Sequence, residues 1–421
     1  MNTKTKLILM NFLEFAVWGA YLTSMGTYLS HAGFGSIIGW FYAVQGIVSI
    51  FMPALMGIVA DRWIPAQRLL GLSHLLAGAF MIGAGMYGHA ANADMRLLFA
   101  LYTLSVAFYM PTIALSNSVA FNALVKKGLD TVKDFPPIRV FGTVGFICSM
   151  WAIDILGYQA SSTQFVVSGL LSVVLALFAQ ILPACPTKKS SAATAEKKKT
   201  VAQVLGLDAF KLFGNRRMAT FFIFSMLLGV SLQITNGYAN PYITSFGTMA
   251  DYADTFGAQH ANILISLSQV SETCCILLIP YFMKKFGIKG VMTMAMVAWV
   301  LRFGLFGAGN PGTGLWMFVL SCLVYGVAFD FFNISGNLFV DQSTDAGIRS
   351  SAQGLFMMMS NGFGATIGTL SAQAVVNHFV YDVDPSMQLA GWRTCWLIFA
   401  GYALVVLLLF LLAFRANGKT Q

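Results

Sequence analysis

Charge is scarce in this sequence. Of its 421 residues, 10% are charged and 57% are hydrophobic, whereas a soluble domain has roughly 25% charged residues. So few charged side chains cannot cover the surface of a soluble protein of this size, which excludes a soluble fold. We therefore expect a chain that lies in a lipid bilayer.

Cysteine and histidine are also rare, and their spacing does not indicate metal chemistry. The six cysteines include no CxxC pair and no pairing with a histidine at the spacing of a zinc site. The sequence has no HExxH motif, no nucleophile with a base partner and no phosphate-binding glycine loop. We expect no metal, no cofactor and no enzymatic activity. Four of the five histidines are interpreted as polar residues near outer loops: His31, His89, His260 and His378.

Long apolar runs make up most of the chain. A bilayer core about 30 Å thick needs roughly 20 apolar residues per helix. Twelve runs fit this length, at roughly 7–30, 36–60, 66–89, 94–125, 138–157, 161–183, 217–246, 258–283, 288–308, 313–340, 350–377 and 388–414. The first run is longer than a signal peptide and has no convincing cleavage site, so we interpret it as a retained helix. The sequence therefore predicts an all-α membrane protein with twelve transmembrane helices.

The net charge of +9 is explained by where the basic residues lie. With the N-terminus placed inside, every lysine and arginine except Arg96, Arg302 and Arg393 falls on the cytoplasmic side. This asymmetry is the positive-inside pattern, which predicts that both termini are cytoplasmic. No nucleic-acid partner is needed to explain the basic character, and we expect none.

A polar stretch divides the chain into two halves. It contains a segment rich in Ser, Ala and Lys, followed by VAQVLGLDAFKLF, which favours a short amphipathic helix at the membrane surface. Six predicted helices precede this stretch and six follow it. We therefore predict an N-terminal six-helix bundle over 1–183, a cytoplasmic linker over 184–216, and a C-terminal six-helix bundle with a short tail over 217–421, with the two bundles facing across a cavity.

Several motifs resemble those of a known transporter family. GIVADRW resembles the loop signature of the major facilitator superfamily, which implies a conformational gating role for Gly57, Asp61 and Arg62. FPPIRVFGTVGF, LGLDAFKLF, FFIFSMLLGVSLQITN, SQVSE and AFDFFNISG are together similar to the nucleoside:proton symporters of bacterial inner membranes. The resemblance implies a major facilitator fold, a nucleoside and protons as partners, and an inner-membrane location. We expect the protein to be a monomer.

Carboxylates in the middle of apolar helices mark a candidate site. At about 1.5 Å per residue, Asp330 lies roughly 15 Å and Glu272 roughly 18 Å from the cytoplasmic end of its helix. An acidic group at the centre of a helix costs at least about 2.5 kcal/mol, so it usually faces a cavity or a partner. Desolvation disfavours the charged form of a carboxyl group, which makes Asp330 and Glu272 candidates for proton coupling. A structural hydrogen bond between helices is the alternative for both.

Helical spacing places further polar and aromatic residues on shared faces. Four predicted helices carry such sets at i, i+3, i+4 or i+7 spacing. Amides and carboxylates can hold ribose hydroxyls and base edges, and aromatic rings can stack on a base. The resemblance implies that nine of these residues contact the substrate: Arg139, Thr143, Phe146, Gln233, Asn236, Gln269, Glu272, Tyr325 and Phe329. Core packing is the alternative for each aromatic residue among them.

Other intramembrane residues carry weaker signals. Glu14 shares a helical face with polar and aromatic neighbours, and we interpret it as a proton-coupling candidate, a gate residue or a structural residue. Arg302 is expected to snorkel or to pair with an acidic group such as Asp154. Gly364 and Gly368 form a GxxxG motif, which indicates helix packing.

These observations lead to one functional prediction with two alternatives. We predict a proton-coupled nucleoside importer that works by alternating access. A proton-coupled sugar or oligosaccharide symporter of the same fold is the nearest alternative. A transporter-like sensor or a membrane enzyme is the alternative from a different class.

Overall fold

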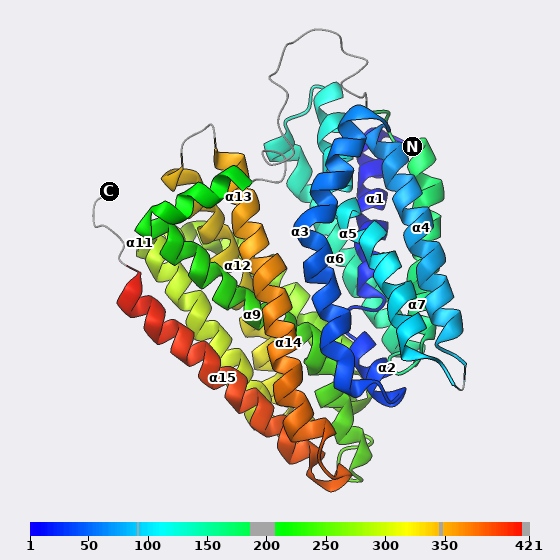
Figure 1. Ribbon diagram of the computed structural model, residues 1–421, viewed down its shortest axis with the longest axis vertical. Helices are drawn as coiled ribbons and strands as arrows, with labels where there is room; N and C mark the ends of the chain where they lie inside the picture. The colour runs from blue at the N-terminus through cyan, green and yellow to red at the C-terminus, as the bar shows by residue number, and fades with distance from the viewer. Residues whose placement is uncertain (91, 186–206, 345–347, 415–421) are drawn as a thin grey trace. The chain divides into compact units, whose positions relative to one another are not determined.

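The computed structural model describes residues 1–90, 92–185, 207–344 and 348–414. Within these ranges the chain is built from helices joined by short turns, and no strand is present (Figure 1). The predicted all-α class is therefore confirmed.

The first half of the chain folds into a series of helices that follow the predicted apolar runs. They are α1 (Thr3–Gly19), α2 (Met25–His31), α3 (Ile38–Arg62), α4 (Ala66–Tyr87), α5 (Met95–Lys126), α6 (Thr131–Ile155) and α7 (Thr163–Phe178), with short 3-10 turns η1 (Gly35–Ile37) and η2 (Ala179–Ile181). The first predicted run is interrupted between α1 and α2.

The second half begins with a 3-10 segment where the amphipathic helix was predicted. The elements are η4 (Leu207–Gly214), α9 (Arg216–Ser245), η5 (Phe246–Thr248), α10 (Phe256–Gln259), α11 (Ala261–Ala308), α12 (Leu315–Ser343), α13 (Arg349–Met357), η6 (Met358–Gly364), α14 (Ala365–Val376), η7 (Asn377–Tyr381), η8 (Pro385–Met387) and α15 (Gln388–Ala413). Two of them, η6 and η7, are π-helical and continue the helices beside them.

Nine helical segments in the described part of the chain are long and apolar enough to cross a membrane. The number is below twelve for three reasons. α1 has only 17 residues, the run at 350–377 is divided among α13, η6, α14 and η7, and α11 contains two predicted spans. α11 is broken at Gly287, whose φ of 67° lies in the left-handed region that favours glycine. The helix count of twelve stays a prediction.

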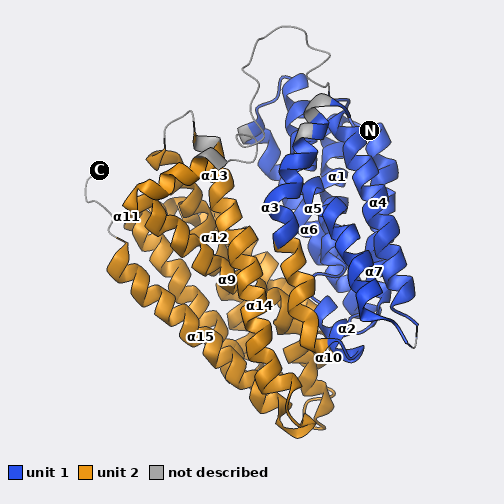
Figure 2. Cartoon of the chain, in the orientation of Figure 1, with its two compact units in different colours: residues 1–34, 47–199 blue, residues 35–46, 200–421 orange. Residues whose placement is uncertain are grey.

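The chain contains two compact units (Figure 2). Unit 1 comprises residues 1–34 and 47–199, and unit 2 comprises residues 35–46 and 200–421. The start of α3 therefore groups with unit 2, although the sequence boundaries assign it to the N-terminal bundle. Gln373 of α14 holds this segment because its amide nitrogen donates to the Gly35 carbonyl at 3.1 Å and its amide oxygen accepts from the Gly39 N–H. Most of the predicted linker lies outside the described residues.

Glycines let the helices approach closely inside each unit. Gly145 of α6 lies directly against the backbone of α1, and Gly364 and Gly368 lie directly against the backbone of α9. A side chain at any of these positions would overlap main-chain atoms. Since helices in lipid associate largely through such packing, the interpretation of the GxxxG motif as a packing motif is confirmed.

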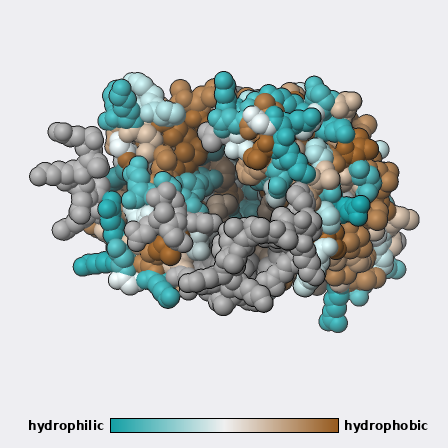
Figure 3. All heavy atoms as spheres, turned by 90° about the horizontal axis from the view of Figure 1, so that it is seen from above, coloured by the Kyte–Doolittle hydropathy of each residue, from teal (hydrophilic) through white to brown (hydrophobic). Residues whose placement is uncertain are grey.

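Large hydrophobic side chains face outward from both units. Leu177 of unit 1 and Leu277 of unit 2, for example, are 69% and 79% exposed. In the end view of Figure 3, hydrophilic side chains occupy much of the visible face and hydrophobic ones show along its flanks. Apolar surface this extensive is stable in lipid but not in water, which supports a multi-pass membrane protein.

Candidate functional site

Three predicted substrate residues lie on α6 in unit 1. Arg139 is half-buried, and its guanidinium carbon lies 3.8 Å from the centre of the Phe15 ring of α1. Phe146 is buried and packs edge-on against Trp18 of α1, with 6.2 Å between ring centroids. Thr143 is half-buried between them along the helix. Arg139 and Phe146, at i and i+7, thus lie against α1, which offers Arg139 a flat aromatic support.

Two amides of unit 2 are paired on α9. Asn236 donates to the side-chain oxygen of Gln233 at 2.9 Å, as their i, i+3 spacing predicts. Gln233 is 8% exposed, while Asn236 is half-buried. The pair leaves further donor and acceptor capacity on both amides, because each amide can make several hydrogen bonds.

The two carboxylates of the predicted site lie on neighbouring helices of unit 2. Glu272 of α11 is half-buried, as is Gln269 one turn before it. Asp330 of α12 is 3% exposed, and its Oδ2 atom has no hydrogen-bond partner in the described part of the chain. Glu272 is close enough to Tyr325 and Asp330 to interact electrostatically with both. These residues therefore form one connected group.

An aromatic stack runs along α12. The rings of Tyr325 and Phe329 are parallel to within 3°, and their centroids are 5.7 Å apart. Tyr325 is 6% exposed, while Phe329 is half-buried. Phe329 is thus the member of the stack that a ligand can reach more easily.

A pocket lies beside this stack within unit 2. Its volume is about 30 Å³, it opens to solvent, and residues of α9, α11, α12, α13 and η6 line it. Phe329, Asn333 and Trp299 are among the lining residues. The polar residues in the middle of α12 therefore have two different surroundings, since Asn333 faces the pocket and Asp330 is buried near Glu272.

Two residues beside the aromatic stack were not predicted as part of the site. Trp299 of α11 packs edge-on against Tyr325, with 6.1 Å between centroids. The guanidinium carbon of Arg302 lies 4.5 Å from the centre of the Tyr325 ring, and Arg302 also donates to the Ser321 carbonyl at 2.8 Å. A tryptophan and an arginine at i, i+3 in an apolar helix are the signal that identifies them.

One of the two expectations for Arg302 was wrong. Arg302 is 2% exposed, so it does not snorkel. It donates to the Ser268 hydroxyl at 3.3 Å and to the Ser321 carbonyl at 2.8 Å. Pairing with an acidic group such as Asp154 stays a prediction.

Glu14 is buried in unit 1 and contacts a histidine that was not among the predicted site residues. Its Oε2 atom lies 2.9 Å from Nε2 of His74, and both side chains are completely buried. His74 is the one histidine that falls within an apolar run away from the loops, which is the signal that could have identified it.

The predicted gating residues lie at the end of α3. A methyl group added at Gly57 would meet no atom within 4 Å. The side chains of Asp61 and Arg62 lie outside the described residues. Gating therefore stays a prediction.

Comparisons with known proteins place this geometry in a family. A family model described as nucleoside H+ symporter matches residues 1–419. The xanthosine permease of Escherichia coli (strain K12) is 45% identical, over 100% of this chain and 98% of the permease.

Solved structures agree with the sequence comparison. The crystal structure of nucleoside transporter NupG is 42% identical, covers 99% of this chain and 100% of that chain, and superposes with a TM-score of 0.90. A D-xylose-proton symporter superposes with a TM-score of 0.70 at 14% identity, which shows the transporter fold alone. On these grounds the chain belongs to the nucleoside H+ symporter family.

Proposed function

We propose that this protein imports nucleosides together with protons across the bacterial inner membrane by alternating access. The observation that carries the proposal is the group formed by Tyr325, Phe329, Glu272 and Asp330 in unit 2. A stacking surface beside polar groups suits a flat base attached to a hydroxyl-rich sugar.

In this proposal different residues bind different parts of the nucleoside. Phe329 stacks on the base, with Tyr325 behind it. Amides and the Glu272 carboxylate hold the polar edges of base and ribose, and α6 contributes a cation, a hydroxyl and a ring. The substrate-binding set is Arg139, Thr143, Phe146, Gln233, Asn236, Gln269, Glu272, Tyr325 and Phe329.

Asp330 and Glu272 are the proposed proton-coupling residues of unit 2. Asp330 is buried, Glu272 is half-buried, and the two carboxylates interact electrostatically, so charging both at once is unfavourable and one proton is favoured on the pair. Uptake of a proton at this group would change the charge beside the substrate. The proton and the nucleoside would then bind in a linked manner.

We further propose that both termini are cytoplasmic and that a single chain is the transport unit. In unit 1, Lys4 pairs with Asp134 at 2.7 Å and Lys6 donates to the Ile181 carbonyl at 2.6 Å, so the basic start of α1 lies beside the start of α6 and the end of η2. A cluster of basic helix ends is typical of a cytoplasmic face. A reporter fusion after Lys199 should score as cytoplasmic, and an external score would contradict this topology.

The proposed gate is Gly57, Asp61 and Arg62 at the end of α3. If these residues control the change between inward-open and outward-open states, Asp61→Asn should slow uptake and leave the affinity for nucleoside unchanged. An affinity loss equal to the loss of uptake would place the residue in the binding site instead.

The decisive experiment measures uptake in sealed proteoliposomes. Labelled uridine and adenosine should accumulate above the outside concentration when the lumen is more alkaline, and the solute recovered inside should be chemically unchanged. Excess xylose or maltose should not compete. Competition by sugars would favour the sugar symporter, and a chemically altered solute would favour a membrane enzyme. Absence of any accumulation would contradict transport.

A further inference from the structure

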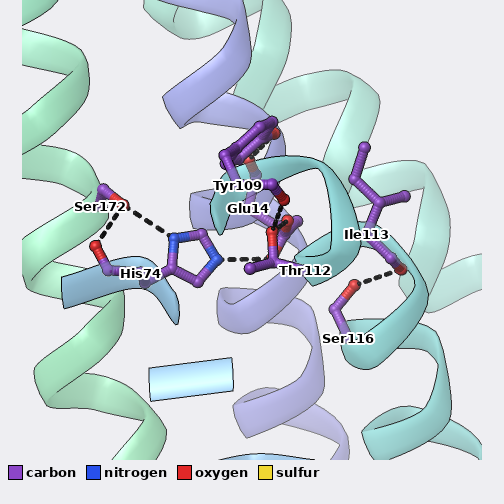
Figure 4. Close-up of polar contacts among 7 residues, drawn as sticks. All are labelled: Glu14, His74, Tyr109, Thr112, Ile113, Ser116 and Ser172. Carbon is purple, nitrogen blue, oxygen red and sulfur yellow. Dashed lines mark hydrogen bonds and ion pairs between the residues drawn. The ribbon is translucent and has the colours of Figure 1, made fainter. Parts of the chain in front are cut away.

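Unit 1 encloses a titratable cluster that the proposed substrate site does not use. Glu14 of α1 and His74 of α4 are both completely buried, with 2.9 Å between Oε2 and Nε2 (Figure 4). Thr112 of α5 donates to the other carboxylate oxygen at 2.6 Å, and Nδ1 of His74 lies 2.9 Å from the hydroxyl of Ser172 on α7. Four helices thus each contribute one polar group to a site inside apolar packing.

The hydroxyl groups of Ser172 and Thr112 each lie within hydrogen-bond distance of two acceptors. Ser172 lies 2.8 Å from the His74 carbonyl oxygen as well as 2.9 Å from Nδ1 of the same residue. Thr112 lies within hydrogen-bond distance of the Tyr109 carbonyl oxygen at 2.5 Å as well as of Glu14. A hydroxyl has one hydrogen, so each of them must choose between its two acceptors. The choice depends on which atoms of the pair carry protons.

This arrangement is compatible with two protonation states of the Glu14–His74 pair. With a proton on both ring nitrogens, His74 donates to Glu14 and to Ser172, and the Ser172 hydrogen turns to the His74 carbonyl. With one proton fewer, His74 donates only from Nε2 to Glu14, and the Ser172 hydrogen turns to Nδ1. The first state has no net charge and the second has a charge of −1. Both states satisfy every hydrogen-bonding group of the pair.

We propose that Glu14 and His74 form a proton-binding site inside unit 1, which takes up and releases one proton during transport and is separate from Glu272 and Asp330. The proton binds at Nδ1 of His74 as the Ser172 hydroxyl turns away, and Glu14 balances the imidazolium charge. The part of this inference that concerns transport rests on the proposed function.

Other groups face this site from the helices packed against it. Tyr109 of α5 donates to the Glu14 carbonyl at 2.8 Å, and its ring lies edge-on to the His74 ring at 5.9 Å between centroids. Tyr21, in the turn between α1 and α2, and Arg139 of α6 are near enough to interact electrostatically with Tyr109. Arg139 rests on the ring of Phe15, the residue that follows Glu14. A change of charge at the pair therefore lies close to the cation that we place at the substrate.

Histidine resonances test the site directly and without any substrate. The full-length protein, with labelled histidine, is studied by nuclear magnetic resonance in lipid nanodiscs, and the His74→Asn spectrum assigns the His74 signal. In the wild type the Nδ1 signal of His74 should change over a range from acidic to alkaline pH, because Nδ1 is the atom that gains or loses the proton. In Glu14→Gln this change should differ from that of the wild type, because the carboxylate that balances the imidazolium charge is gone.

Two outcomes of this titration would overturn the site. A His74 signal that does not move over the range would identify a fixed structural pair. A signal that titrates identically in Glu14→Gln would show that Glu14 takes no part. His89→Asn is the matched control, because His89 is exposed and its Nε2 atom lies 3.2 Å from the Thr163 hydroxyl, outside the cluster of Glu14 and His74. This control should leave the His74 titration unchanged.

Transport tests the role of the site. In Glu14→Gln and His74→Asn, pH-driven accumulation of uridine should fall at least about tenfold while uridine counterflow, which needs no net proton movement, stays within about twofold. His89→Asn should behave as the wild type. Unchanged accumulation in both variants would overturn the role in transport. If the wild type itself moves no nucleoside, the proposed function fails, and the resonance titration still decides whether the pair binds a proton.

Discussion

Replacement of Phe329 by alanine tests the aromatic face of the proposed site. The Phe329 ring is stacked on Tyr325 on one side and is half-buried beside a pocket, so a nucleobase can stack on it. Loss of one stacking contact to a base costs about 1–3 kcal/mol. This corresponds to a roughly five- to 150-fold weaker affinity for nucleoside.

The cost to folding should be smaller than for a buried phenylalanine nearby. Phe329→Ala removes one ring pair, worth about 0.5–1.5 kcal/mol beyond burial. Phe331, two residues further along α12, is 1% exposed and packs on Phe282 with 5.1 Å between centroids. Phe331→Ala should therefore cost about 3–5 kcal/mol of stability, as for other buried phenylalanines.

The assay compares uridine binding with unliganded melting temperature for both variants. Phe329→Ala should lose affinity with a small change in melting temperature, and Phe331→Ala should show the opposite pattern. Normal uridine binding by Phe329→Ala, or a loss of binding that merely follows lost stability, would refute the stacking role and leave Phe329 as a packing residue.

Four other substitutions, with Gly401→Val as a control for one of them, probe the remaining parts of unit 2. Gln233→Ala leaves Asn236 without its partner and should weaken uridine binding by about 1–3 kcal/mol; unchanged binding in equilibrium dialysis would remove the α9 amides from the site. Asp330→Asn and Glu272→Gln should each abolish uphill uptake in proteoliposomes driven by a pH gradient, and if both retain it, neither carboxylate couples the proton. Gly368→Val should lower the melting temperature, because overpacking typically costs about 1–3 kcal/mol, whereas Gly401→Val, where an added methyl group meets no atom within 4 Å, should not. Equal melting temperatures for the two valine variants would show that the close approach of α14 and α9 is unimportant.

Features that depend on one helix were predictable from the sequence. The lengths of the apolar runs placed most of the helices, because the thickness of the bilayer sets a minimum length for each span. Helical periodicity placed Gln233 beside Asn236 and Tyr325 beside Phe329, and these pairs are in contact. The pitch of the helix alone determines such neighbours, so no knowledge of packing was needed.

Contacts between helices required the tertiary structure. Glu14 and His74 are 60 residues apart in the chain, and no spacing rule relates them. The support of Tyr325 by Arg302 and the attachment of residues 35–46 to Gln373 of α14 likewise involve different helices. The physical reason is that a helix fixes the direction of its own side chains, while the partner that each side chain meets depends on how close neighbouring helices pack. Glycines such as Gly145 and Gly368 determine that distance.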